Sequence, residues 1–120
     1  MKAVFDTNIL IDYLNGIPAA KKELDRYDSC VISIITWMEV MSGGVPEHAD
    51  ITRAFLNRFV ALAIDEPIAE RAVVLRRERR LKLPDAIILA TALESGLTLV
   101  TRNTKDFGGS SPDIRVPYRV

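Results

Sequence analysis

The stretch Ala3-Val4-Phe5-Asp6-Thr7-Asn8-Ile9-Leu10 indicates the fold class, because a short apolar run is followed at once by a helical pattern. Ala3-Val4-Phe5 predicts a buried strand that ends at Asp6. From Asn8 to Leu14 the apolar side chains recur at helical spacing, and the breaker Asn15-Gly16-Ile17-Pro18 ends that helix. A strand that leads directly into a helix is typical of α/β proteins.

Strands and helices continue to alternate along the rest of the chain. Further strands are predicted at Val31-Ile32, Leu62-Ala63-Ile64 and Leu97 to Val100, with a short edge strand at Ile114-Arg115-Val116 that Pro117 protects. Helices are predicted over 19–27, from the capping residue Ser33 to Gly43, over 47–59, over 66–80, and from Pro84 to Gly96. The pattern predicts one α/β domain over residues 1–120, with a parallel sheet of four to five strands flanked by helices. The strand-free stretch 33–59 is expected to be an added helical hairpin.

Composition restricts the class of protein. The 120 residues suffice for one core, and 16 basic residues balance 16 acidic ones, which counts against a protein that holds nucleic acid by bulk charge. Between Glu70 and Lys82, however, six basic residues outnumber two acidic ones; such a helix face is either solvated surface or a phosphate contact. The single cysteine and the absence of any signal-length or membrane-length apolar run predict a cytoplasmic protein.

Three acidic residues are predicted to meet at one edge of the sheet. Asp6 directly follows the first strand, Glu39 lies in the helix after the second, and Asp85 opens the helix that leads into the fourth. In an open α/β sheet the ligand site lies outside the carboxyl ends of the strands. Thr101-Arg102-Asn103 follows the fourth strand, with Asp106 three residues further on, and is expected at the same edge.

Each acid also has a structural explanation. Asp6 suits the N-cap of the first helix, and Asp85, next to Pro84, suits the positive end of a helix dipole; the sequence leaves both explanations open. Glu39 is harder to explain in this way, because its helix is apolar on most sides. A carboxylate there is expected either at the rim of the core or buried with a partner, since an unpaired buried charge is costly.

A cluster of carboxylates is stable when a cation compensates their mutual repulsion. Oxygen ligands without histidine or thiolate favour the hard ions Mg²⁺ and Mn²⁺, which activate water and neutralise charge on a phosphodiester. The sole histidine, His48, lies in the loop-like stretch Val45-Pro46-Glu47-His48 and is assigned to the surface, so a histidine-based nuclease is disfavoured. The predicted metal ligands are Asp6, Glu39 and Asp85.

Four segments occur in a characteristic order: Val4 to Leu10, Ser33 to Glu39, Leu83 to Ala92 and Leu99 to Phe107. Their order and spacing resemble the PIN domain over essentially the whole chain, and in particular the VapC toxins of bacterial and archaeal toxin–antitoxin pairs. The resemblance implies a PIN-like three-layer fold. It also implies a ribonuclease that uses Mg²⁺, for which Mn²⁺ is expected to substitute.

The resemblance also assigns roles to residues. The family's first three acids match Asp6, Glu39 and Asp85, whereas its fourth acidic position holds Asn103, a departure that weakens a second cation more than a first. Asp106 is the acid that can supply the missing charge, and it joins the other three as a candidate catalytic residue. Side chains expected to orient the acids and waters are Thr7, Asn8, Thr101 and Asn103. Basic residues expected to contact RNA phosphates are Arg76, Arg79, Arg80, Lys82 and Arg102.

The partners that the resemblance implies are RNA, a second copy of the chain in a homodimer, and a VapB-type antitoxin. The C-terminal segment of such an antitoxin blocks the site, and operator DNA is bound only through the antitoxin's N-terminal part. Apolar side chains that could line the antitoxin groove, or else belong to the core, are Tyr13, Leu14, Trp37, Met38, Met41 and Phe55.

Two alternatives have less support. A catalytically weak or inactive PIN fold that only binds RNA or protein rests on Asn103 alone, and three clustered acids without a metal would be destabilising. A phosphoryl-transfer enzyme or receiver domain would use Asp6 as a nucleophile. The dehalogenase pattern requires an acid two residues after the nucleophile, where this chain has Asn8. A receiver domain requires a lysine at the end of a late strand, and Lys105 lies beyond the strand end.

Overall fold

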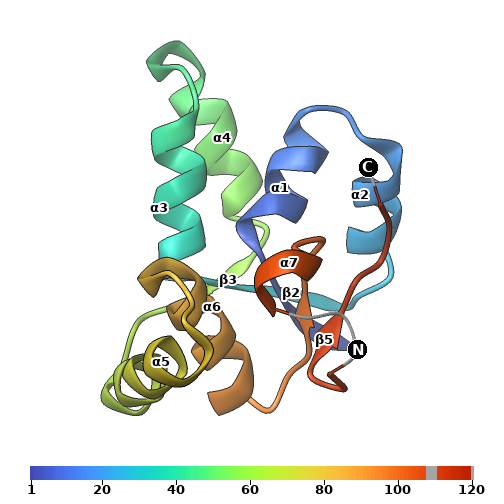
Figure 1. Ribbon diagram of the computed structural model, residues 1–120. Helices are drawn as coiled ribbons and strands as arrows, with labels where there is room; N and C mark the ends of the chain where they lie inside the picture. Colours follow the sequence, from blue (N-terminus) through green and yellow to red (C-terminus); the bar gives the residue numbers. More distant parts are fainter. Residues whose placement is uncertain (108–110, 120) are drawn as a thin grey trace.

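The central element of the fold is a parallel sheet of five strands. The structure is a computed structural model (Figure 1), and it describes residues 1–107 and 111–119. The strand order is β3-β2-β1-β4-β5, so the first strand of the chain lies in the middle of the sheet. The strands are β1 (Lys2–Phe5), β2 (Ser29–Ser33), β3 (Val60–Leu62), β4 (Leu99–Val100) and β5 (Ile114–Arg115).

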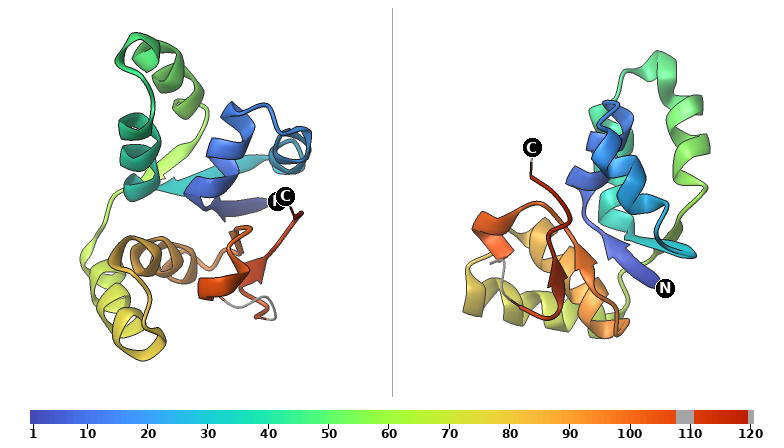
Figure 2. Two further views of the ribbon diagram at one scale, coloured as in Figure 1. Left: turned by 45° about the horizontal axis from the view of Figure 1, so that its top comes forward. Right: turned by 90° about the vertical axis from the view of Figure 1, so that its right-hand side faces the viewer.

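Helices cover both faces of this sheet. Figure 2 shows the first four helices on one side and α5 with α6 on the other, and α3 and α4 rise from the sheet as a hairpin. The helices are α1 (Thr7–Leu14), α2 (Pro18–Leu24), α3 (Ile34–Gly43), α4 (Ala49–Leu56), α5 (Glu66–Arg79), α6 (Leu83–Glu94) and α7 (Thr104–Phe107), and a 3-10 turn, η1 (Pro46–His48), precedes α4. The predicted three-layer α/β architecture is confirmed.

The alternation of side chains along β1 explains why both faces need a cover. Ala3 and Phe5 belong to the apolar cluster under the first four helices, and Val4 belongs to the cluster under α5 and α6. Successive side chains of a strand point to opposite faces, so a strand that is apolar throughout requires two hydrophobic layers. The sheet thereby holds the end of β1, and Asp6 after it, in a fixed place.

Some predicted boundaries were wrong. The third strand spans Val60–Leu62 rather than 62–64, because Leu62 pairs with the last residue of β2 and Asp65 caps α5. The helix predicted over 47–59 begins as the turn η1 and ends at Leu56. The short helix α7 was not predicted. No helix in the described ranges is long and apolar enough to cross a membrane.

Candidate active site

Asp6 is both a helix cap and a member of the candidate site. The Thr7 backbone N–H donates to Asp6 Oδ1 at 2.7 Å, which makes Asp6 the N-cap of α1. Thr101 Oγ1 donates to Asp6 Oδ2 at 2.7 Å from the end of β4, and Asn8 Nδ2 lies 3.3 Å from the same oxygen. The two explanations of Asp6 that the sequence left open are therefore compatible, because its two oxygens face different donors.

The three predicted metal ligands, Asp6, Glu39 and Asp85, line one pocket beyond the carboxyl ends of β1 and β4. The cavity has a volume of about 320 Å³, and its lining comes from α1, α3, the first turn of α6 and the residues that follow β1 and β4. Its lining residues are Asp6, Thr7, Asn8, Ile11, Glu39, Asp85, Arg102 and Asn103. Residues that are distant in the sequence thus meet at the sheet edge that the strand order dictates.

The electrostatics of the pocket oppose negative charge. Burial, together with the charges of Asp85 and Glu39, raises the pKa of Asp6 to about 6, although the hydrogen bonds from Thr101 and Thr7 act in the opposite direction. Burial also raises the pKa of Asp85, and the charges of Asp106 and Glu39 add to this effect, while Lys82 reduces it. A cation in the pocket would relieve both shifts.

Glu39 is exposed rather than buried, yet it is held in place. Thr7 Oγ1 donates to Glu39 Oε1 at 2.7 Å, and Thr7 Oγ1 also lies 3.0 Å from the hydroxyl of Thr36, which is fully buried. The partner expected for this carboxylate is therefore a threonine of α1.

Asn103 and Asp106 bind each other at the start of α7. The Asp106 backbone N–H donates to Asn103 Oδ1 at 3.1 Å, and Asn103 Nδ2 donates to Asp106 Oδ2 at 3.0 Å. The first bond is that of an N-cap, and the second joins the two side chains, because the Asn103 backbone N–H donates instead to Thr101 Oγ1. Asn103 lines the pocket, whereas Asp106 is exposed and acts on the pocket through its charge on Asp85.

The donors suit a hard divalent ion. Within residues 1–107 and 111–119, no three Asp, Glu, His or Cys side chains lie close enough together to hold a metal as they stand. Asp6, Glu39 and Asp85 share one pocket without converging on one point. Mg²⁺ usually keeps several waters and takes only one or two protein carboxylates, so an open pocket of oxygen donors fits it better than a closed cage would.

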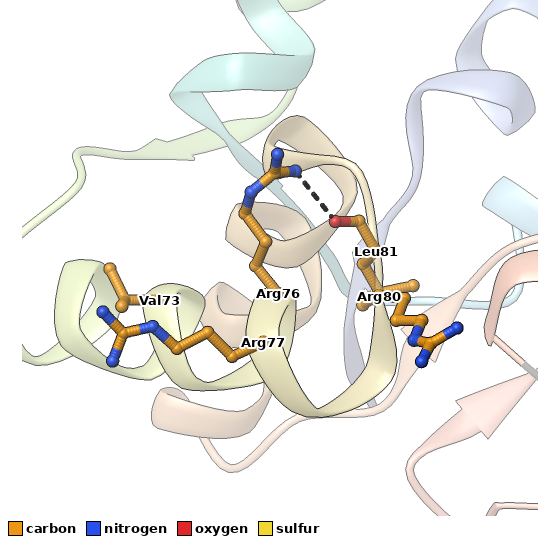
Figure 3. A pocket seen from close by; sticks show the side chains of 5 residues that line it. All are labelled: Val73, Arg76, Arg77, Arg80 and Leu81. Atoms are coloured by element: carbon orange, nitrogen blue, oxygen red, sulfur yellow. Dashed lines mark hydrogen bonds between the residues drawn. The ribbon is translucent and has the colours of Figure 1, made fainter.

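The predicted RNA-contacting residues fall into two groups. Figure 3 shows Arg76 and Arg80, together with Arg77, which was not among the predicted residues, pointing in different directions around a cavity of about 520 Å³. Arg76 Nη1 donates to the Leu81 carbonyl at 3.1 Å. Lys82 is exposed in the following turn. Two other arginines bind protein groups: Arg79 donates to the Phe107 carbonyl at 2.7 Å, and Arg102 binds Asp12.

Two of the arginines are held by carboxylates that were not predicted as partners. Asp12 and Glu23, in α1 and α2, are 5% and 4% exposed and bind Arg102 and Arg115. An aspartate inside the apolar run Ile9-Leu10-Ile11-Asp12-Tyr13-Leu14 was the available signal, because a charge on a buried face needs a partner.

A carboxylate pocket at the carboxyl edge of a five-stranded parallel sheet, beside a helical hairpin, is the architecture of a PIN-type nuclease fold. The chain belongs to the PIN-domain family: the sequence profile of that family, described as "PIN domain", matches residues 3–108. Within that family it is a VapC-type toxin, as the following similarities indicate.

The relatives cover nearly the whole chain. It is 32% identical to the "tRNA(fMet)-specific endonuclease VapC" of Shigella flexneri, across 89% of this chain and 90% of that protein. A chain of a toxin–antitoxin complex from Klebsiella pneumoniae is 52% identical, with a TM-score of 0.92 over 98% of this chain and 99% of that one. A chain of DNA-bound VapBC from Salmonella typhimurium is 26% identical, with a TM-score of 0.79 over 96% of both.

Proposed function

We propose that this VapC-type protein is an endoribonuclease that depends on Mg²⁺ or Mn²⁺, cleaves tRNA, and is inhibited by a cognate antitoxin. The observation that carries the proposal is the pocket shared by Asp6, Glu39 and Asp85, in which burial and mutual repulsion raise the pKa of Asp6 and Asp85. Transfer RNA is the proposed substrate class because the Shigella flexneri relative is named for cleaving it.

The residues have distinct roles in this proposal. Asp6, Asp85 and Glu39 would hold the ion, which when bound activates a water molecule and neutralises charge on the scissile phosphodiester. Thr101 and the Thr7 N–H keep Asp6 oriented. Asn103 presents a neutral amide where a fourth carboxylate would favour a second ion, so one cation is the proposed stoichiometry.

Substrate binding is assigned to the basic turn between α5 and α6. The guanidinium groups of Arg76 and Arg80 and the ammonium group of Lys82 lie on the exposed surface that leads to Asp85. Because the arginines spread apart rather than converge (Figure 3), they suit successive phosphates of an RNA strand better than a single bound anion. Arg79 and Arg102 would add positive charge to the same surface while their guanidinium groups keep their protein partners.

The antitoxin is assigned to an apolar groove between α1 and the α3–α4 hairpin. The groove has a volume of about 500 Å³, and Ile11 lines both this groove and the candidate site. Of the apolar residues predicted to line a groove or belong to the core, Leu14 lies in the groove. Phe55 is buried and stacks on Tyr13 with ring centroids 4.8 Å apart. A bound antitoxin segment would therefore reach the carboxylates directly. A homodimer, and operator DNA held by the antitoxin, complete the proposed assembly.

The proposal is tested with the protein purified free of antitoxin. Cleavage of a purified tRNA pool is measured in EDTA and after addition of Mg²⁺ or Mn²⁺, for the wild type and for Asp6→Ala, Asp85→Ala and the exposed α4 control Asp50→Ala. We expect cleavage only with metal, and only in the wild type and Asp50→Ala. Undiminished cleavage in EDTA or by either pocket variant would contradict the mechanism.

A further inference from the structure

An aspartate outside the proposed set of metal ligands is held by an arginine and a tyrosine. Asp12 in α1 accepts hydrogen bonds from Arg102 Nε at 2.5 Å, from Arg102 Nη2 at 3.0 Å and from Tyr118 Oη at 2.9 Å. A bidentate arginine–carboxylate pair is strong and fixes the direction of both side chains. The buried carboxylate therefore determines where the Arg102 side chain lies.

Arg102 joins this ion pair to the candidate active site. It follows Thr101, whose hydroxyl donates to Asp6 Oδ2 at 2.7 Å. The Arg102 backbone N–H donates to Asn8 Oδ1 at 3.4 Å, and Asn8 Nδ2 lies 3.3 Å from both Asp6 Oδ2 and Thr101 Oγ1. The Arg102–Asp12 pair thus ties the turn after β4 to the same helix whose first turn carries Asn8 and is capped by Asp6.

A matched ion pair occurs away from the site. Glu23 in α2 accepts hydrogen bonds from Arg115 Nε at 2.7 Å, from Arg115 Nη2 at 3.0 Å and from Tyr27 Oη at 2.9 Å. The two clusters share a bidentate arginine, a tyrosine hydroxyl and similar burial of the carboxylate, and Glu23 has in addition Arg26 Nη1 at 3.6 Å. Only the first includes a residue that lines the candidate pocket, namely Arg102.

We infer that Asp12 is a positioning residue for the cleavage reaction: by holding Arg102, it fixes the turn from which Thr101 orients Asp6 and against which Asn8 packs. This inference rests on the proposed function of the pocket. Without the carboxylate, the guanidinium group, whose side chain is 36% exposed, gains more from water than from a neutral partner. The turn then loses its anchor to α1, and Asn8 and Thr101 lose their fixed geometry.

The test compares Asp12→Asn with Glu23→Gln in the full chain, because each removes one buried charge and keeps the side-chain shape. We expect similar losses of thermal stability in both variants. In Asp12→Asn alone, kcat for tRNA cleavage should fall between about 10-fold and 100-fold with little change in KM, as for groups that orient metal ligands. In Asp12→Asn alone, the Asn8 side-chain amide resonances of the metal-free protein should shift and exchange faster with solvent.

Unchanged Asn8 resonances in Asp12→Asn, or a kcat equal to that of Glu23→Gln, would overturn the inference. An effect confined to KM would also overturn it and would make Arg102 an RNA contact. The NMR measurement requires neither metal nor RNA, so an inactive wild type would contradict the proposed function without affecting this test. If Asp12→Asn does not fold, Tyr118→Phe against Tyr27→Phe removes one hydrogen bond from each cluster and should show the same contrast more weakly.

Discussion

Thr7 Oγ1 lies 2.7 Å from Glu39 Oε1 and joins the first turn of α1 to the middle of α3. The Thr7 backbone N–H meanwhile donates to Asp6 Oδ1, so one residue holds two of the three acids of the pocket. The Thr36 hydroxyl lies 3.0 Å from Thr7 Oγ1. Because the single hydrogen of the Thr7 hydroxyl is donated to Glu39, Thr36 donates to Thr7. The buried Thr36 hydroxyl therefore orients the exposed Glu39 carboxylate indirectly, through the Thr7 hydroxyl.

Replacement of Thr7 by valine should release Glu39 while leaving the backbone contact to Asp6 intact. We expect kcat for RNA cleavage to fall roughly tenfold, as for other groups that orient metal ligands. Thr7→Ser keeps the hydroxyl and should retain most activity. Thr91→Val serves as the control, because the Thr91 hydroxyl binds the Ile87 carbonyl inside α6. Equal rates for Thr7→Val and Thr7→Ser would remove the hydroxyl from the mechanism.

The stability of the metal-free protein should depend on the ionisation of Asp6. Its pKa is raised in the folded state to about 6 from 3.8, so its contribution to stability is full below pH 3.8 and is lost as the pH rises through about 6. By this effect alone the free energy of unfolding should fall by up to roughly 3 kcal/mol between pH 4 and pH 7.

Urea unfolding in EDTA at several pH values measures this effect when the wild type is compared with Asp6→Asn. The difference isolates Asp6 from groups such as Asp12: burial raises the pKa of Asp12, but its bonds to Arg102 and Tyr118 outweigh that effect and lower the pKa overall. Such a group contributes stability that is lost as the pH falls, which is the opposite sign. If the free energy of unfolding depends on pH in the same way in both proteins, the ionisation of Asp6 does not destabilise the folded state.

Exchange of the two side chains that cap α7 should strengthen metal binding without loss of the cap. Asn103→Asp alone places a carboxylate against that of Asp106, so we expect a lower melting temperature in EDTA. The double variant Asn103→Asp with Asp106→Asn keeps one amide and one carboxylate in contact and moves the charge onto the pocket-lining position. Titration calorimetry should show tighter Mn²⁺ binding than in the wild type; unchanged affinity would exclude this position from the ion's environment.

Substitution of Arg80 by glycine should change RNA binding and thermal stability in opposite directions, because of the backbone conformation of Arg80. Arg80 has φ of 54° at the end of α5, the only positive φ outside glycine in the described part of the chain. Left-handed backbone costs a non-glycine residue about 1 kcal/mol, so Arg80→Gly should raise the melting temperature. It should also weaken RNA binding and make the slope of log K against log salt concentration shallower by about 1 for each phosphate that the protein no longer neutralises.

These measurements use an Asp85→Ala background so that bound RNA is not cut. Arg80→Ala should weaken binding equally without the gain in stability, and Lys22→Gln, an exposed change on α2, should alter neither property. If Arg80→Gly is more stable and binds RNA as well as the parent does, Arg80 has no part in the RNA surface.

Local signals predicted most of the fold. The apolar run before Asp6 and the cap at Ser33 mark β1 and α3, because both depend on neighbouring residues alone. The strand order then brings Asp6, Glu39 and Asp85 to one pocket, as expected. The ion pairs of Arg102 and Arg115 were not predictable, since their carboxylates lie about ninety residues earlier in the chain. The helix α7 was missed because its stability depends on the Asn103–Asp106 pair rather than on an apolar pattern.

The place of β1 in the sheet has a consequence for synthesis of the protein. This first strand pairs with β4, whose residues are made about 95 residues later, since Val4 pairs with Leu99, and the pocket also requires Asn103. Chains emerge from the ribosome N-terminus first at about 5–20 residues per second, so β1 waits several seconds for its neighbour. Under the proposed function, a nascent chain in which β4 has not yet joined the sheet therefore has no complete pocket for RNA cleavage. The antitoxin then has to intercept only chains in which the sheet has formed.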